Sequence, residues 1–371
     1  MVNNNNNNKY GENFLIDELK DRDELIEDLF TYWREKGFPQ HNKNEYDYRK
    51  ELSKLISFDE NTILQGKDLK QTMHGCGFLW TYFPHWNTVR CGGDKKSVLE
   101  HWNDDKELKT LIRKTIDYEI KHNKSIFTIN RLRQNAKVYC SKQSVSNFRP
   151  SVAKYIYNTY GNKGVVWDMS SGFGGRLLGF LASDCKKYIG TDPSTPTYNG
   201  LLEMKKDYSY VGKDIELHKL GSETYIPEEN SLDLCFTSPP YFDTEKYTDE
   251  DTQSYKKFPS TDLWLNGFLK TTMKNCYLGL KDTGYMIINI ANTKSYPTVE
   301  KDILDVADEV GFECVDLLYL TLSSISGKGV KREPIFIFQK KNRITTNIKE
   351  VKKDDGNNNN SNTTIRYGSL W

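Results

Sequence analysis

The residues best suited to chemistry in this sequence are Thr237 to Tyr241 (TSPPY), which directly follow the apolar run LDLCF. Two prolines at the end of a strand fix the backbone and remove two amide donors, so their carbonyl groups face a cleft without competing N–H groups. The Ser238 hydroxyl adds an acceptor, and the Tyr241 ring offers a face on which a planar base can stack. The pattern suits an exocyclic amine whose two N–H bonds point at Ser238 and at the Pro239 carbonyl. The alternative is a Pro-Pro loop that only ends a strand.

A second group of residues surrounds a glycine-rich turn. The run 165–168 (VVWD) leads into 168–176 (DMSSGFGGR), and a helix-forming segment follows. A strand, a glycine turn and a helix hold nucleotide-like ligands at the carboxyl edge of a parallel sheet, because glycine permits a tight turn and close backbone approach. Asp192 ends the next predicted strand, 20 residues after Gly172, where an acid can accept hydrogen bonds from both hydroxyls of a ribose.

Two features of this turn argue against a dinucleotide or phosphate ligand. Leu177 stands where the pattern G-x-G-x-x-G requires glycine, and the G-K-[ST] of a phosphate loop is missing. Asp168 at the mouth of the turn would repel a pyrophosphate but suits an ammonium group. A ligand with an amine and a ribose but no phosphate fits, so we expect S-adenosylmethionine; the alternative is that the glycines only make a sharp turn. The predicted cofactor residues here are Asp168, Ser170, Gly172, Gly174 and Asp192.

With these motifs in place, residues 147–341 resemble the DNA amino-methyltransferases that modify cytosine N4 or adenine N6. The signature of that family is [Ser/Asn/Asp]-Pro-Pro-[Tyr/Phe]. Methylases of phages and mobile elements carry a similar DMSSGFGGR turn and a similar TSPPYFD stretch. The resemblance implies that Phe148, before the helix from Ser151, lines the methionine end of the cofactor. It also implies that Ser222 lies near the adenine ring.

The resemblance further implies direct methyl transfer to a base flipped out of the DNA duplex. Ser238, Pro239, Pro240 and Tyr241 are then the predicted catalytic residues. Serine in the first motif position favours cytosine N4 over adenine N6. No cysteine follows a proline in the chain, so the nucleophile of C5-cytosine methylation is missing. The alternatives are methylation of RNA or of a protein glutamine, and a catalytically silent subunit that only binds nucleic acid.

The elements that must position these residues alternate regularly from about residue 147. Apolar runs predict seven strands, and amphipathic stretches between them predict helices, including 261–280 and 298–310. Such alternation predicts an α/β fold with a doubly wound, mostly parallel seven-stranded sheet, which is Rossmann-like and typical of class I S-adenosylmethionine-dependent methyltransferases. We therefore expect a methyltransferase domain over residues 146–343. The predicted strands are 165–168, 186–191, 215–219, 232–237, 284–292, 313–322 and 333–339.

Residues 10–145 form a predicted helical or mixed N-terminal region. Family members with this motif order usually carry a target-recognition domain after the Pro-Pro motif, whereas here only a short loop, 242–260, stands there. The stretch 121–150 contains no Asp or Glu and could neutralise DNA phosphates, with a solvated basic helix face as the alternative. Arg131, Arg133 and Lys137 are the predicted DNA contacts. Target recognition would then come from the loop 242–260, from residues 10–145 or from a separate specificity or restriction partner; the alternative is that recognition is weak.

Composition excludes several other classes. The 52 Lys and Arg nearly balance the 51 Asp and Glu, so any nucleic-acid footprint must be local. No apolar run reaches eighteen residues and no signal peptide is recognisable, and seven cysteines without a C-x-x-C pair favour a reducing compartment, so we expect an intracellular protein. No metal site is expected. Residues 1–9 and 344–371 have the composition of disordered tails.

Overall fold

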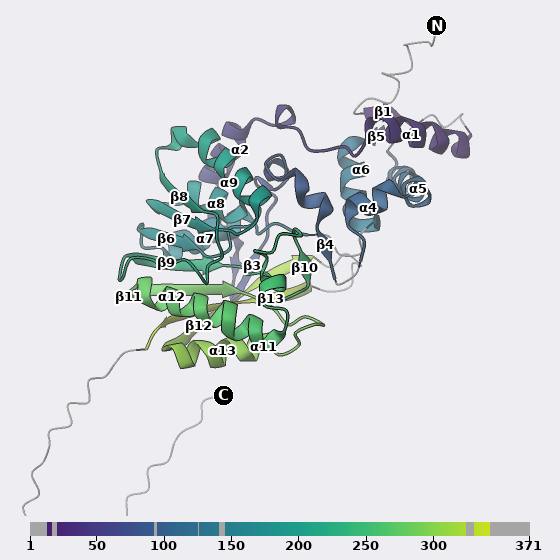
Figure 1. Cartoon of the computed structure of the whole chain (residues 1–371). Coiled ribbons are helices and arrows are strands. Elements are labelled where there is room, and N and C mark those ends of the chain that lie inside the picture. Colours follow the sequence, from purple (N-terminus) through teal and green to yellow (C-terminus); the bar gives the residue numbers. More distant parts are fainter. Residues whose placement is uncertain are drawn as a thin grey trace, which may run out of the picture. The chain divides into compact units, whose positions relative to one another are not determined.

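A nine-stranded mixed sheet lies at the centre of the structure, in the order β2-β3-β12-β13-β11-β9-β6-β7-β8 (Figure 1). The computed structural model describes residues 13–16, 21–92, 95–124, 126–140, 145–323 and 330–341, so both predicted tails lie outside the described residues. The strands of the sheet are β2 (Leu64–Gln65), β3 (Asp68–Lys70), β6 (Val165–Asp168), β7 (Lys187–Thr191), β8 (Asp214–His218), β9 (Leu232–Thr237), β11 (Leu280–Asn289), β12 (Phe312–Ser323) and β13 (Val330–Lys340).

All seven predicted strands are present, and their order is that of a class I methyltransferase. Strands β8, β7, β6, β9 and β11 run parallel, whereas β13 is antiparallel to both β11 and β12. The chain winds from β6 toward β8 and then returns to the other side of β6 with β9. Such a reversal of strand order opens a crevice at the carboxyl ends of the strands, where ligands of α/β sheets bind.

Helices cover both faces of the sheet, and the strands alternate between two cores. Val166 and Phe236 belong to the core beneath α7, α8 and α9, whereas Trp167 and Cys235 belong to the opposite core with α12 and α13. This alternation follows from the period of two in a strand. The helices concerned are α7 (Pro150–Tyr160), α8 (Gly175–Leu181), α9 (Thr195–Asp207), α11 (Thr261–Leu263), the π-helix η6 (Trp264–Leu269), α12 (Lys270–Gly279) and α13 (Val299–Val310).

The N-terminal region is helical as predicted, but it is not separate from the methyltransferase fold. Its strand β3 pairs in parallel with β12, and β2 pairs with β3, so the seven predicted strands become nine. Its side chains share one continuous core with α7 and α8. The remaining helices of this region are α1 (Arg22–Lys36), η1 (Lys43–Glu45), α2 (Tyr48–Ser57), η2 (Glu60–Ile63), α3 (Cys76–Leu79), η3 (Pro84–Thr88), α4 (Val98–Asn103), α5 (Asp105–Lys121), α6 (Ile129–Asn135) and the π-helix η4 (Ala136–Cys140).

The loop predicted over 242–260 contains regular structure and contacts the N-terminal region. It contains β10 (Glu245–Lys246) and α10 (Ser254–Lys257), and β10 pairs with β4 (Arg90–Cys91) of the N-terminal region. Glu250 accepts a hydrogen bond from the first backbone N–H of α9, at 2.9 Å from Thr195 N, and Thr252 donates to the Pro193 carbonyl. Residues 242–260, the crossing segment, therefore leave the end of β9 and contact the start of α9. A second small ribbon joins β1 (Asn13–Leu15) to β5 (Ile126–Thr128), and η5 (Ser209–Val211) follows α9.

None of the helices in the described ranges is both long and apolar enough to cross a bilayer.

Candidate active site

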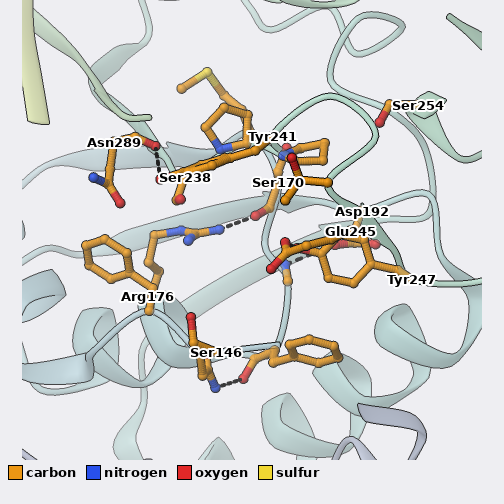
Figure 2. A pocket seen from close by; sticks show the side chains of 18 of the residues that line it. Ser146, Ser170, Arg176, Asp192, Ser238, Tyr241, Glu245, Tyr247, Ser254 and Asn289 are labelled. Carbon is orange, nitrogen blue, oxygen red and sulfur yellow. Dashed lines mark hydrogen bonds between the residues drawn. The ribbon is translucent and has the colours of Figure 1, made fainter. Parts of the chain in front are cut away.

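One cavity of about 1000 Å³ lies at the carboxyl ends of the parallel strands (Figure 2). Gly172 lines it after β6, Asp192 after β7, Ser238 after β9 and Asn289 at the end of β11. The two motif groups found in the sequence, far apart in the chain, therefore face the same space. Its position is the crevice that the reversal of strand order creates.

Asp192 lies at the edge of this cavity, and its carboxylate oxygens can accept further hydrogen bonds. Its Oδ2 accepts a hydrogen bond from Gly172 N at 2.9 Å, and its Oδ1 accepts one from Ser194 N at 3.0 Å. Burial raises the pKa of this carboxyl to about 6, although the two backbone donors oppose the rise. Each oxygen keeps a lone pair for a hydroxyl group, as a ribose contact requires.

The two predicted glycines of the turn have different surroundings. Gly172 has φ +56°, and a Cβ placed there would meet no atom closer than 3.8 Å, so the backbone is open to a ligand on that side. Gly174 also has positive φ, +70°, but a Cβ there would lie 2.4 Å from Met204 Sδ, and Gly174 does not line the cavity. The prediction that Gly174 contacts the cofactor is therefore corrected: it shapes the turn at the start of α8.

Asp168 is the second correction. Its side chain is fully buried, and Arg176 Nε lies 3.0 and 2.9 Å from its two oxygens, while Tyr188 donates to it at 2.8 Å. Asp168 does not line the cavity, so it is not available to an ammonium group. It holds Arg176, which does line the cavity and donates to the carbonyl of Ser170. Ser170 also lines the cavity. The sequence prediction missed Arg176, although it closes the DMSSGFGGR motif.

The two residues carried over from the resemblance, Phe148 and Ser222, both line the cavity. Phe148 precedes α7 and lines the cavity with its ring beside Arg176, whose guanidinium lies 5.6 Å from the ring centroid. Ser222 is buried at the cavity wall, and its Oγ lies 2.8 Å from Thr272 Oγ1. Both therefore border the same space as Asp192.

The Pro-Pro motif forms the other end of the cavity. The carbonyl of Pro240 accepts a hydrogen bond from Phe242 N at 2.9 Å, whereas that of Pro239 accepts none from the residues that the structure describes. Phe242 has φ +53°, a conformation that costs on the order of 1 kcal/mol in a non-glycine residue, and its buried ring near Trp264 and Tyr296 holds the turn. The chain is thereby bent sharply behind the motif, and Ser238 and Pro239 face the cavity.

Comparison with known proteins identifies the family. Residues 232–371, which begin at β9 and include the TSPPY motif, match the family model N6_N4_Mtase, described as DNA methylase. The part of the chain from β9 onward is therefore similar to DNA methylases. The protein is a DNA amino-methyltransferase, and its methyl donor is S-adenosylmethionine. No curated protein sequence matches the chain.

Solved structures of methyltransferases are similar to this methylase at low identity. The 1,6-didemethyltoxoflavin-N1-methyltransferase of Burkholderia thailandensis is 12% identical, with a TM-score of 0.37 over 52% of this chain and 77% of that chain. TYW2 of M. jannaschii is 16% identical, with a TM-score of 0.33 over 52% of this chain and 74% of that chain. The fold assignment rests on the strand order and not on these similarities.

Further cavity residues that the sequence did not reveal include three polar side chains. Glu333 comes from β13, and Glu245 and Gln253 come from the crossing segment. Gln253 is 5% exposed, and its Nε2 has no hydrogen-bond partner among the described residues, which leaves a donor for a ligand. No local pattern marks these residues; only the pairing of β10 with β4 and of β13 with β11 brings them to the site.

The lining is acidic on balance. Arg176 is paired with the buried Asp168, Glu333 with Lys331 and Glu223 with Lys257, which leaves Asp192 and Glu245 against one lining cation. An acidic cavity suits a cationic ligand such as a sulfonium and disfavours a phosphate. The described ranges contain no group of three or more His, Cys, Asp or Glu side chains that could hold a metal ion.

The predicted DNA contacts require the third correction. Arg133 is 2% exposed and is held by Glu45, with its Nη1 2.6 Å from Glu45 Oε2. Lys137 Nζ lies 3.9 Å from the centroid of Trp80 and 4.2 Å from that of Trp86, and burial lowers its pKa to about 7. Neither side chain is free to meet a phosphate.

Arg131 is partly exposed but already has a partner. Its Nε lies 3.2 Å from Glu119 Oε1, and its guanidinium lies 4.2 Å from the ring centroid of Tyr118. The three predicted DNA contacts are therefore engaged with groups of the N-terminal region, whereas Lys121 and Lys124 of the same stretch are exposed.

Proposed function

We propose that this methylase transfers a methyl group to the N4 amine of cytosine in DNA, with the base turned out of the duplex into the cavity. The observation that carries the proposal is that Ser238 and Asp192, from the ends of two different strands, line one cavity. An amine in a base pair lies inside the duplex, so the base must leave the stack to reach a site at the edge of a sheet.

The residues around Asp192 fit S-adenosylmethionine. Asp192 would accept hydrogen bonds from the ribose, the open side of Gly172 allows close approach, and the unpartnered Nε2 of Gln253 supplies a donor. Ser170, Phe148 and Ser222 complete this end of the cavity. When bound, the cofactor supplies a methyl group on a positively charged sulfur, which matches the acidic lining.

The residues around Ser238 act on the base. Ser238 Oγ and the Pro239 carbonyl accept the two N–H bonds of the target amine, which directs its lone pair toward the methyl group. These contacts strengthen as the amine loses its planar geometry, so they lower the barrier more than they strengthen ground-state binding. Serine at this position favours cytosine N4.

The test is to express the methylase and its Ser238→Ala variant in a host without DNA methylation and to measure modified nucleosides by mass spectrometry. We expect N4-methylcytosine from the parent protein and a strong loss from the variant. N6-methyladenine in its place would move the assignment to adenine, and equal methylation by both proteins would show that the site is wrong.

A further inference from the structure

The hydroxyl of Tyr241 lies inside the active site and has more contacts than a stacking ring needs. It lies 3.4 Å from the backbone carbonyl of Asn289 (Figure 2). It also lies 3.4 Å from Glu333 Oε2. A hydrogen bond from Ser238 acts to lower the pKa of this hydroxyl, while burial and Glu333 raise it well above its usual value. The Tyr241 hydroxyl therefore links Ser238 to Glu333 in one chain of polar contacts.

The chemistry of its members fixes the direction of this chain. An ionised carboxylate only accepts, and so does the Asn289 carbonyl, so Tyr241 must donate its proton to one of them. The oxygen of Tyr241 then accepts from the Ser238 hydroxyl. With its own proton engaged, Ser238 Oγ turns its lone pairs toward the cavity.

The direction matters because a serine hydroxyl can also donate. A donating Ser238 would bind the lone pair of the target amine and block the nucleophile. Glu333 has a cation beside it, because Lys331 Nζ lies 2.8 Å from Glu333 Oε1. Glu245, which lines the same cavity, also acts electrostatically on Tyr241.

We propose that the Tyr241 hydroxyl and Glu333 are positioning residues that hold Ser238 as an acceptor for the target amine and receive the proton that the amine loses. This inference rests on the proposed function. It separates two roles of Tyr241, because the ring would stack on the base and the hydroxyl would belong to the relay.

The proton balance of the step is simple. The nitrogen forms its bond to the methyl carbon as the carbon–sulfur bond breaks and the sulfur becomes neutral. The surplus proton on nitrogen passes to Ser238 Oγ, the Ser238 proton to Tyr241, and the Tyr241 proton to Glu333. Glu333 ends as a neutral carboxyl group and returns its proton to water. The contacts of 3.4 Å are long for this purpose, but catalytic hydrogen bonds commonly shorten only when the substrate is bound.

The experiment compares Tyr241→Phe, Tyr241→Ala and Glu333→Gln in single-turnover methylation, with base capture followed by a fluorescent base analogue at the target position. We expect Tyr241→Phe and Glu333→Gln each to lower the methylation rate on the order of 10- to 100-fold, the range of a lost proton-transfer contact. Affinity for S-adenosylmethionine and base capture should stay unchanged in both. Tyr241→Ala should lose base capture as well, because its ring is gone. The matched control is Glu313→Gln, the same change at an exposed position of β12.

A second measurement does not depend on activity. With 3-fluorotyrosine in place of Tyr241, fluorine NMR follows the titration of that hydroxyl alone. Because Glu333 raises the pKa of Tyr241, Glu333→Gln should shift the titration to lower pH.

The outcomes separate this inference from the proposed function. Wild-type rates in Tyr241→Phe and Glu333→Gln, with Ser238→Ala still inactive, would overturn the relay and leave the function standing. A wild-type rate in Ser238→Ala would overturn the site itself. An unshifted titration would show that Glu333 does not contact Tyr241 in solution.

Discussion

The strand ends of the sheet and the helices of the N-terminal region use charged and polar residues in opposite ways. At the strand ends, Asp192 and Ser238 keep acceptor capacity that faces an open cavity. In the N-terminal region, Arg133 is buried and forms an ion pair with Glu45, 88 residues away in the chain. The position of a strand end is fixed by topology, so a polar residue there is predictably open to a ligand. Whether a charged residue on a helix is open to a ligand cannot be predicted until its tertiary partners are known.

Replacing Arg133 tests this contrast most strongly. Arg133→Ala leaves Glu45 without its buried partner and the Pro39 carbonyl without a donor. Removing one member of a buried ion pair costs about 3–5 kcal/mol, so we expect the free energy of unfolding to fall by that amount in denaturant titrations. The salt dependence of DNA binding by the remaining folded protein should not change.

The control for this variant is Lys121→Ala, which removes the same charge at an exposed position of α5 and should change stability by less than about 0.5 kcal/mol. If Arg133→Ala were stable and instead flattened the salt dependence of DNA binding, Arg133 would be a phosphate contact after all.

Replacing Ser238 tests the other side of the contrast. Ser238→Ala removes an acceptor that is used most in the transition state, so we expect the methylation rate to fall on the order of 10- to 1000-fold. Stability and affinity for S-adenosylmethionine should be preserved, as calorimetry can show. Ser209→Ala, at an exposed serine of η5, is the matched control. A loss of stability equal to the loss of rate would mean that Ser238 is structural.

The sequence predicted the sheet well because alternating apolar runs determine strands locally, and β6, β7 and β9 lie within two residues of their expected bounds. The sequence did not predict strands whose formation depends on pairing between distant segments of the chain. Strands β2 and β3 carry no alternation of their own. They are strands because β3 pairs with the edge of β12 and β2 pairs with β3.

The same limit applies to the site. Ser238 and Asp192 belong to recognisable local motifs, and both face the cavity. Asp168 belongs to such a motif too, but the sequence could not show that Arg176, eight positions later, would turn back and neutralise it. Glu333 lies in no motif and enters the site through the pairing of β13 with β11, which is a tertiary event.

A smaller effect is expected at the cofactor end. Asp192→Ala removes a carboxylate that would accept hydrogen bonds from the ribose, so affinity for S-adenosylmethionine should fall by roughly 1–3 kcal/mol. The measurement is isothermal titration calorimetry. Asp214→Ala, at an exposed acid of the neighbouring strand β8, should bind as the parent does. Equal affinity in both variants would remove Asp192 from the cofactor site.

The pH dependence of cofactor binding is the finest test of the contrast between strand ends and N-terminal helices. It depends directly on whether the Asp192 carboxylate is ionised and free to accept hydrogen bonds from the cofactor. Burial raises the pKa of Asp192 from its ordinary value of 3.8 to about 6, so the carboxylate becomes protonated as the pH falls from 7 to 5. Only the ionised form offers both oxygens as charged acceptors, so affinity for S-adenosylmethionine should drop by up to about tenfold over this range. The contribution of Asp192 to the stability of the free protein should move the opposite way. A raised pKa in the folded state means that ionisation opposes folding, so this contribution to the free energy of unfolding is most favourable below pH 4 and decreases as the pH rises to about 6. Asp192→Asn should flatten both profiles, and binding that is equally tight at pH 5 and pH 7 in the parent protein would show that the ribose does not depend on this carboxylate.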